Sequence, residues 1–254
     1  GRIDLGDALN NTGLGRDVLA NITTGSANIA LGDAALDANT TGSYNAALGY
    51  AALSANTTGS SNVAVGSGAL DANTTADNNT AVSRSALGAN TTGIRNIAVG
   101  AYALEANTTA NNNTAVGYNA GADLTTGTAN VAIGAYSLDA ATTVSDNTAV
   151  GYYTLSANTT GDKNTCLGSG AMSVNTTGHS NVAVGYAALD ANTTADYNTA
   201  VGRNSLTANT TGQYNTAVGY QSLRVNTTSS ENTAIGAAAL ELMTTGSANT
   251  AVGH

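Results

Sequence analysis

The same order of apolar, small and polar side chains repeats along this chain every seventeen positions. An asparagine recurs at every seventeenth position from Asn11 to Asn249, without insertion or deletion. We number each period from this asparagine as slot 1, which gives the consensus N-T-A-V-G-Y-x-A-L-x-A-N-T-T-G-x-x. Slot 3 is nearly always Ala, slot 4 is Val, Leu or Ile, and slot 9 is Leu except at Gly121 and Met172. The repeat therefore dominates any interpretation of the fold.

Slots 1 to 5 have the pattern of a β-strand. Slots 2 and 4 carry β-branched or apolar side chains and alternate with small residues, which is the two-residue period of a strand. A unit of seventeen residues is too short for a helical hairpin repeat, which needs about 33 residues. Gly at slot 5 predicts a bend, and A-N-T-T-G at slots 11 to 15 predicts a turn followed by a short strand. We expect an all-β fold, a parallel β-solenoid (β-roll) of about fifteen coils, one for each repeat unit, that forms one domain over residues 1–254.

Stacking of the coils in register would place equal slots above one another, about 4.8 Å apart. Slot 1 would then form an asparagine ladder whose amides hydrogen-bond along the axis. Because slots 4 and 9 are apolar, we expect both to lie inside the coil, with Val65, Val99 and Val218 buried. In one coil the slot-9 leucine is missing at Gly121 and a leucine appears at slot 12 as Leu124, which predicts a local change in core filling.

A single solenoid with so thin a core predicts self-association, because small cores give marginal stability. We expect a parallel homotrimer, with end-to-end filament growth as the alternative. If slots 2 and 4 face inward, slots 1, 3 and 5 form a smooth outward face that another copy could approach, and Ala183→Arg at slot 3 should dissociate the trimer. The filament alternative rests on the ends, because neither Gly1 nor His254 offers an obvious polar cap.

Three segments carry a resemblance to known repeats. Residues 62–66 and 181–185 read N-V-A-V-G, and residues 130–134 read N-V-A-I-G. They resemble the V-A-I-G centre of the head repeats of trimeric autotransporter adhesins, and they are similar to the N-T-A-V-G-Y repeats of phage and bacterial tail-fibre-like proteins. The resemblance implies a left-handed parallel β-roll, usually with three chains side by side, on a cell or virion surface. The seventeen-residue period is longer than that of typical adhesin heads.

Composition and charge narrow the classes of partner. The net charge is −9, with 7 Lys and Arg residues against 16 Asp and Glu residues, which argues against a nucleic-acid partner. No stretch approaches the roughly 18 consecutive apolar residues of a membrane-spanning helix, so we expect no membrane insertion. The chain starts at Gly1 without Met and shows no secretory signal, which predicts a segment of a longer fibre protein.

The residue types that carry catalysis or bind metals are scattered. His179 and His254 lie far apart in the sequence, and Cys166 replaces Ala in slot 3, which favours a small packed thiol over a nucleophile. No Cys/His cluster or calcium-binding repeat occurs, and no paired carboxylates stand out as in a polysaccharide depolymerase. We therefore predict no catalytic residue, no cofactor and no metal, and we expect that the protein is not an enzyme. The acidic residues of slot 10 are interpreted as a solvated edge: Asp37, Asp71, Asp139 and Asp190.

Slot 12 carries a repeated N-T-T sequence that satisfies the acceptor pattern for N-glycosylation. Turn chemistry explains it equally, because Asn suits a tight bend and Thr suits a strand. We favour the structural interpretation, and glycosylation of a secreted chain stays open. The candidate acceptors are Asn39, Asn56, Asn73, Asn90, Asn107, Asn158, Asn175, Asn192, Asn209 and Asn226.

Two further rows suggest ligands. Threonine fills slots 13 and 14 in every full coil, which raises the possibility of ice binding. Neighbouring residues of a strand point to opposite faces, so only one of these columns would face outward, whereas flat ice-binding faces need two. Tyrosines at slots 6 and 7 could bind glycans or pack against a partner chain: Tyr102, Tyr118, Tyr136, Tyr152, Tyr153, Tyr186 and Tyr220.

These patterns favour a structural and adhesive role. We expect an extracellular fibre segment, such as a surface appendage or a tail-fibre shaft on a cell or virion surface. Its partners would be other copies of itself and cell-surface or environmental glycans. The alternative is a ligand-binding solenoid for ice or polysaccharide.

Overall fold

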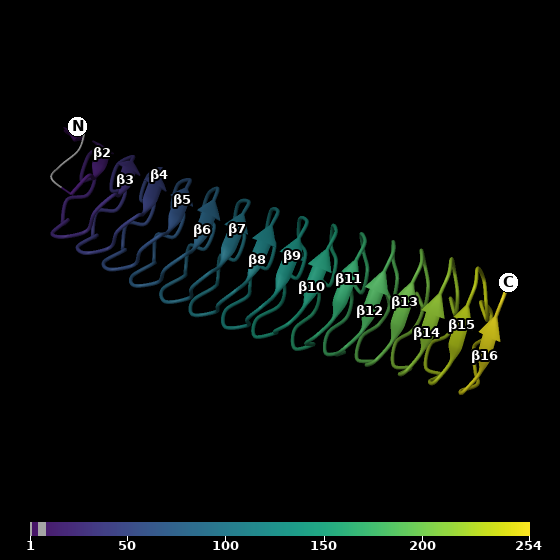
Figure 1. Ribbon diagram of the computed structural model, residues 1–254. Coiled ribbons are helices and arrows are strands. Elements are labelled where there is room, and N and C mark those ends of the chain that lie inside the picture. The colour runs from purple at the N-terminus through teal and green to yellow at the C-terminus, as the bar shows by residue number, and fades with distance from the viewer. Residues whose placement is uncertain (1, 5–8) are drawn as a thin grey trace. The chain divides into compact units, whose positions relative to one another are not determined.

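The structure, a computed structural model, describes residues 2–4 and 9–254 as short β-strands joined by turns. It divides into two compact units, residues 1–128 (unit 1) and residues 129–254 (unit 2). Within each unit the parallel strands follow one another in chain order and begin at every seventeenth residue (Figure 1). Each unit is therefore an all-β parallel β-solenoid with one repeat of the sequence per turn, which confirms the predicted fold class. The single folding domain stays a prediction.

The parallel strands of unit 1 pair in register, so that equal slots are neighbours. For example, Ala64 lies opposite Ala81 and Val65 lies opposite Val82. The strands are β1 (Arg2–Asp4), β2 (Thr12–Gly15), β3 (Ile29–Leu31), β4 (Ala46–Leu48), β5 (Val63–Val65), β6 (Thr80–Val82), β7 (Ile97–Val99) and β8 (Thr114–Val116).

Unit 2 repeats the same arrangement. Ala200 lies opposite Ala217, and Val201 lies opposite Val218. Its strands are β9 (Val131–Ile133), β10 (Thr148–Val150), β11 (Thr165–Leu167), β12 (Val182–Val184), β13 (Thr199–Val201), β14 (Thr216–Val218), β15 (Thr233–Ile235) and β16 (Thr250–Val252).

The strands turn a different face inward from the one predicted. The slot-3 side chains, such as Ala64 and Ala183, have no exposed surface, whereas Val65, Val99 and Val218 in slot 4 are only half-buried. Slot 4 therefore faces outward together with slot 2, and slots 1 and 3 face inward. The expectation that slot 4 lies in the core is wrong, and so is the choice of slots 1, 3 and 5 as the outward face.

The narrow interior of the coil explains this orientation. A Cβ atom added at Gly13 in slot 3 would lie 3.1 Å from Val18 Cγ1 and 3.4 Å from Leu19 Cδ1, so slot 3 directly faces slots 8 and 9. The slot-9 leucine already fills this space, and only a methyl group fits opposite it. Cys166, the one slot-3 residue larger than Ala, accompanies a change at slot 9, where its Sγ lies 3.3 Å from Met172 Sδ.

The prediction for slot 9 is confirmed, since leucines such as Leu53 and Leu104 are fully buried. The exceptional coil is also filled as expected. Leu124 in slot 12 is fully buried, and its N–H donates to the carbonyl of Gly121 over 3.1 Å. The absence of a side chain at Gly121 leaves the interior space that a slot-9 leucine fills elsewhere.

Two asparagine ladders, rather than one, run through the interior of each unit. In slot 1, Asn45 N–H donates to Asn28 Oδ1 over 2.9 Å. In slot 12, Asn56 Nδ2 donates to Asn39 Oδ1 over 2.9 Å. Both ladders meet at the carbonyl of slot 15, because Gly59 O accepts from Asn45 Nδ2 at 2.8 Å and from Asn56 Nδ2 at 2.9 Å. Amides inside the ladders are therefore paired, which removes most of the cost of burying them.

The slot-12 ladder ends wherever the next coil lacks an asparagine. Asn107 is followed one period later by Leu124, and Asn226 is followed by Met243. The Oδ1 atoms of Asn107 and Asn226 are buried and accept no hydrogen bond from any described residue. Each ladder end therefore leaves one buried acceptor unsatisfied. Inside the ladder, the same Oδ1 atom accepts a hydrogen bond from the asparagine of the next coil.

The turns of each coil contain left-handed backbone at residues other than glycine. Slots 7, 9 and 17 repeatedly have positive φ, as at Ala51 (54°), Leu53 (53°) and Ser61 (58°). Slot 5 favours glycine for an additional reason, with Ser83 (φ 115°) as the exception. Gly49 has φ of 137°, and a Cβ atom there would lie 2.6 Å from the carbonyl oxygen of Gly66 in the next coil. The stacked hydrogen bonds must offset a left-handed backbone cost of about 1–2 kcal/mol per residue.

Glycine at slot 7 is therefore expected to stabilise the fold. Ala51→Gly should raise the free energy of unfolding by about 0.5–1 kcal/mol, because glycine adopts positive φ without a Cβ clash. Gly68 and Gly170 already occupy this slot. The adjacent Ala52→Gly is the control, since Ala52 is fully buried and outside the left-handed region, and it should lose about 1–2 kcal/mol. Chemical denaturation of both variants checks this, and a loss of stability in Ala51→Gly would contradict it.

The N-terminal edge of unit 1 differs from the expectation of an uncapped end. The backbone of β1 pairs antiparallel with β2, with Ile3 opposite Leu14. This pairing occupies the strand edge that another parallel coil would need, and a paired edge is no longer a template for addition. Growth on this edge would first require β1 to leave β2, and end-to-end association stays a prediction.

Candidate functional site

The residues that could carry catalysis lie apart. Cys166 is fully buried in slot 3, where desolvation raises the pKa of its thiol and keeps it protonated. His179 lies in slot 16, where its Nδ1 accepts the N–H of Asp162 over 2.9 Å, and His254 is exposed. Among residues 2–4 and 9–254, no group of three or more His, Cys, Asp or Glu side chains could hold a metal ion. The same residues include no helix that is long and apolar enough to cross a bilayer.

Slot 16 is a row of hydrogen-bond acceptors. Ser60 N–H donates to Asp77 Oδ1 over 2.6 Å, and His179 N–H donates to Asp196 Oδ1 over 2.6 Å. Each acceptor belongs to the coil that follows the donor. Ser, Asp, Asn and His all serve here because only an acceptor near the backbone is needed, which explains the variability of this slot.

The sequon asparagines belong to the interior ladder. All ten candidate acceptors are fully buried, and each donates its Nδ2 to a slot-15 carbonyl, as Asn158 does to Gly161 over 2.7 Å. A glycan on this nitrogen would need the side chain to leave the ladder. The folded coil therefore keeps these ten amides away from an enzyme in solution, and the N-T-T sequence has a structural explanation.

The outward sheet face carries a continuous row of aliphatic side chains in each unit. In unit 1 the exposed fraction reaches 52% at Ile29 and 42% at Leu31. The large hydrophobic residues exposed on this face are Leu14, Ile29, Leu31, Leu48, Val63 and Ile97 in unit 1, and Ile133, Leu167, Ile235 and Val252 in unit 2. Sequence reasoning missed this surface because it placed slot 4 in the core.

Threonines contribute to two different outward surfaces. The slot-13 hydroxyl is engaged along the stack, as Thr40 Oγ1 donates to Thr57 O over 3.0 Å. The slot-14 threonines, such as Thr41 and Thr58, are exposed. Only the slot-14 column is therefore free. Slots 11 to 15 of the described coils form no strand, so the short strand predicted there is wrong, and its alternation is not the reason that only one column is free.

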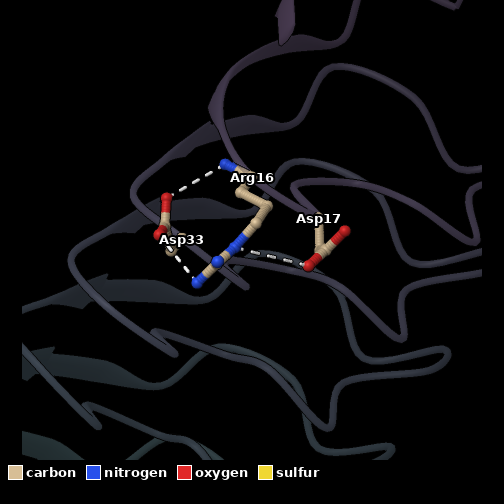
Figure 2. A network of polar contacts seen from close by, with 3 residues as sticks. All are labelled: Arg16, Asp17 and Asp33. Carbon is tan, nitrogen blue, oxygen red and sulfur yellow. Dashed lines mark hydrogen bonds and ion pairs between the residues drawn. The ribbon is translucent and has the colours of Figure 1, made fainter. Parts of the chain in front are cut away.

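Slots 6 and 7 form an edge that holds tyrosines and charged residues. Figure 2 shows its N-terminal part, where Arg16 in slot 6 pairs with Asp33 in slot 6 of the next coil at 3.3 Å and with Asp17 at 3.8 Å. All three side chains are well exposed, so these pairs add at most about 1 kcal/mol. They show that side chains of this edge reach one another between neighbouring coils.

The tyrosines of the same edge pack on one another. Tyr136 and Tyr153, both in slot 7, stack with ring centroids 4.8 Å apart, and Tyr152 meets Tyr153 edge-on at 4.4 Å. In unit 1, Tyr102 meets Tyr118 edge-on at 6.0 Å. The tyrosines at slots 6 and 7 therefore form an aromatic surface along this edge of each unit.

The slot-10 carboxylates are half-buried beside this edge. Desolvation raises the pKa of Asp71, although hydrogen bonds from the backbone oppose the change. Ser173 donates to Asp190 in the next coil. A Cβ atom added at Gly68 in slot 7 would lie 3.9 Å from Asp71 Oδ2, so slots 7 and 10 of one coil are neighbours.

No protein-family model, no curated protein and no solved structure matches this chain.

Proposed function

We propose that this chain is a structural and adhesive fibre segment whose copies associate through the outward sheet face of slots 2 and 4. The observation that carries the proposal is the row of exposed aliphatic side chains on that face. Soluble monomers rarely expose contiguous apolar surface beyond a few hundred Å², and larger patches mark interaction sites. Ten large hydrophobic residues on this face are more than a third exposed, among them Leu31 and Leu167.

A second copy of the same chain is the partner that fits this face best. The face repeats at every seventeenth residue, so its pattern matches only a surface with the same axial spacing. Closed rotational symmetry presents identical surfaces to one another at equal height. We therefore propose a parallel homotrimer in which slots 2 and 4 point toward the shared axis.

This assembly assigns a role to each surface of the coil. A fibre segment on a cell or virion surface would use the coil stack for reach and the sheet face for assembly. The tyrosine edge and the slot-14 threonines would stay outside, where weak contacts with glycans could be repeated along each chain. No catalytic step is part of this proposal.

The mass of the purified protein in solution tests the proposal. The chain has a mass of 24.8 kDa, so sedimentation equilibrium at micromolar concentration should give a mass about three times larger. A stable soluble monomer over that range of concentration would overturn the proposal, whatever ligand the chain binds.

A second candidate function is favoured by the threonines of the same face in unit 2. Slot 2 is threonine in six of the eight strands of unit 2: Thr148, Thr165, Thr199, Thr216, Thr233 and Thr250. Their hydroxyls donate to no residue within 129–254, and they alternate with the aliphatic slot-4 column. A row of hydroxyls and methyls at strand spacing suits ordered water at an ice surface or a polysaccharide. A monomer that shows thermal hysteresis would support this alternative.

A further inference from the structure

The edge formed by slots 6 and 7 holds guanidinium groups over tyrosine rings in both units. In unit 1, the Arg84 guanidinium carbon lies 4.7 Å from the centroid of the Tyr102 ring. In unit 2, the Arg203 guanidinium carbon lies 5.8 Å from the centroid of Tyr186. Both distances are within the roughly 6 Å over which a ring face attracts a cation. The chain therefore provides its own examples of arginine recognition on this edge.

Two tyrosines in the largest aromatic cluster of the edge have no such cation above them. Tyr152 and Tyr153 are 55% and 39% exposed, and they pack with Tyr136. No Arg or Lys of the described residues lies over the ring of Tyr152 or Tyr153. Unit 2 contains only three Lys or Arg residues, Lys163, Arg203 and Arg224, and none lies in slots 6 to 10 of the coils that carry this cluster.

A carboxylate completes the cluster. Desolvation is the main cause that raises the pKa of Tyr153, followed by its interactions with Tyr152 and Tyr136 and, last, by the negative charge of Asp139. Asp139 occupies slot 10 of the coil in which Tyr136 occupies slot 7, and these slots are neighbours in the repeat. In unit 1 the same two slots hold Tyr102 and Glu105, where Arg84 supplies the cation.

We propose that Tyr136, Tyr152 and Tyr153, together with Asp139, form a binding site for an arginine side chain of a partner protein. Planar guanidinium stacks on aromatic faces and is weakly hydrated, so it matches the exposed rings, and the negative charge of slot 10 beside them favours a cation over a neutral group. The charge of the chain agrees, since a net charge of −9 attracts basic partners. The site lies off the sheet face, so its test is independent of self-association.

The test uses Nα-acetyl-arginine amide as the probe and Nα-acetyl-citrulline amide as its uncharged isostere. The chain has 11 tyrosines and no Trp or Phe, so NMR spectra of tyrosine-labelled protein report each ring separately. We expect saturable shifts of the Tyr152 and Tyr153 ring signals, with a dissociation constant on the order of 1–10 mM. Citrulline should bind at least about tenfold more weakly, since it lacks the charge that the rings attract.

Variants distinguish this cluster from general attraction to an acidic protein. Tyr152→Ala/Tyr153→Ala should weaken binding of the arginine probe by about tenfold or more, because two ring contacts are lost. The fold should persist, since Ala135 and Ala187 occupy the same two slots in other coils. Tyr220→Ala, at an exposed slot-6 tyrosine, is the matched control and should leave the dissociation constant unchanged.

Three results would overturn the site. These are an absence of saturable shifts up to about 100 mM probe, equal binding of citrulline and arginine, and a double variant that binds as well as the Tyr220 control. A loss of circular dichroism signal in the double variant would move the comparison to the single variants Tyr152→Ala and Tyr153→Ala. Each of these should then weaken binding by about threefold, and unchanged binding in both would contradict the proposal.

Discussion

Replacing Leu104 by aspartate is expected to unfold the coils around it. Leu104 is 1% exposed in slot 9 and fills the interior opposite slot 3. Loss of a buried leucine alone costs about 2–5 kcal/mol, and a carboxylate in its place has no cationic partner inside the coil. A total loss above about 5 kcal/mol is large against the stability of an ordinary domain. Amide hydrogen exchange should therefore show β6, β7 and β8 unprotected.

Ser60→Asp is the matched control for the same introduced charge. Slot 16 already holds Asp77 and Asp162, and Ser60 Oγ accepts the N–H of Ser43 over 3.1 Å, a role that a carboxylate can take. The neighbouring Asp77 adds a like charge, so we expect a loss below about 1 kcal/mol. Equal loss of protection in both variants would contradict the assignment of slot 9 to the interior.

Replacing Asn56 by alanine is expected to break the slot-12 ladder. Asn56 donates to Asn39 Oδ1 and to Gly59 O, and its own Oδ1 accepts Asn73 Nδ2 over 2.8 Å. The variant leaves the oxygen of Asn39 and one N–H of Asn73 buried without a partner. At about 1–3 kcal/mol for each of these two groups, the expected cost is about 2–6 kcal/mol. Hydrogen exchange and denaturant unfolding should both report it.

Thr58→Ala controls for a change in the same turn. Thr58 in slot 14 is exposed, and its hydroxyl donates to no described residue. Its loss should change the free energy of unfolding by no more than about 0.5 kcal/mol. If Asn56→Ala were as mild as Thr58→Ala, the interior hydrogen bonds would not contribute to stability, and the sequons would need another explanation.

The period of the sequence was enough to predict the coil. Every parallel strand begins where the repeat places slot 2, and the register between strands equals the repeat length, as Thr148 opposite Thr165 shows. Because every repeat has the same length, equal slots align only when the coils stack in parallel. Leu104 and Leu124 were also predicted correctly, because a large aliphatic side chain in so polar a sequence has few other places to be buried.

The inward face of the strand was predicted wrongly because apolar character was taken as the sign of burial. The interior of so short a coil is too narrow for Val or Leu opposite a slot-9 leucine, so Ala64 points inward and Val65 points outward. Constancy of size was the signal that could have found this. Slot 3 is almost always Ala, whereas slot 2 varies among Thr, Val, Ile and Ala.

Constancy of residue type also marked the buried asparagines of slot 12. The constancy of Asn39 and its equivalents looked like a row of sequons, because the acceptor pattern uses the same residues as the turn. In the folded coil, Asn39 Nδ2 and Asn28 Nδ2 share the carbonyl of Gly42, each at 2.9 Å. Contacts across a coil depend on how the turns close, and a one-dimensional pattern does not contain that information.

The correction also changes the expected effect of Ala183→Arg. Ala183 is fully buried inside the coil, so arginine there should disrupt folding rather than dissociate an assembly. A variant that tests assembly must instead change slot 4. Leu167 is outward and exposed, and Ser169, two residues later in the same coil, occupies slot 6, where Arg16, Arg84 and Arg203 occur naturally.

Self-association through the sheet face is therefore tested most directly by sedimentation equilibrium of Leu167→Arg and Ser169→Arg beside the unmodified chain. In a trimer, Leu167→Arg would place three arginines near the shared axis, where they repel one another and lose hydration. Ser169→Arg places the arginine in slot 6, which remains in solvent. We expect a trimer for the unmodified chain and for Ser169→Arg, and a folded monomer near 24.8 kDa for Leu167→Arg. Equal masses for the two variants, or dissociation of Ser169→Arg alone, would contradict assembly through slots 2 and 4.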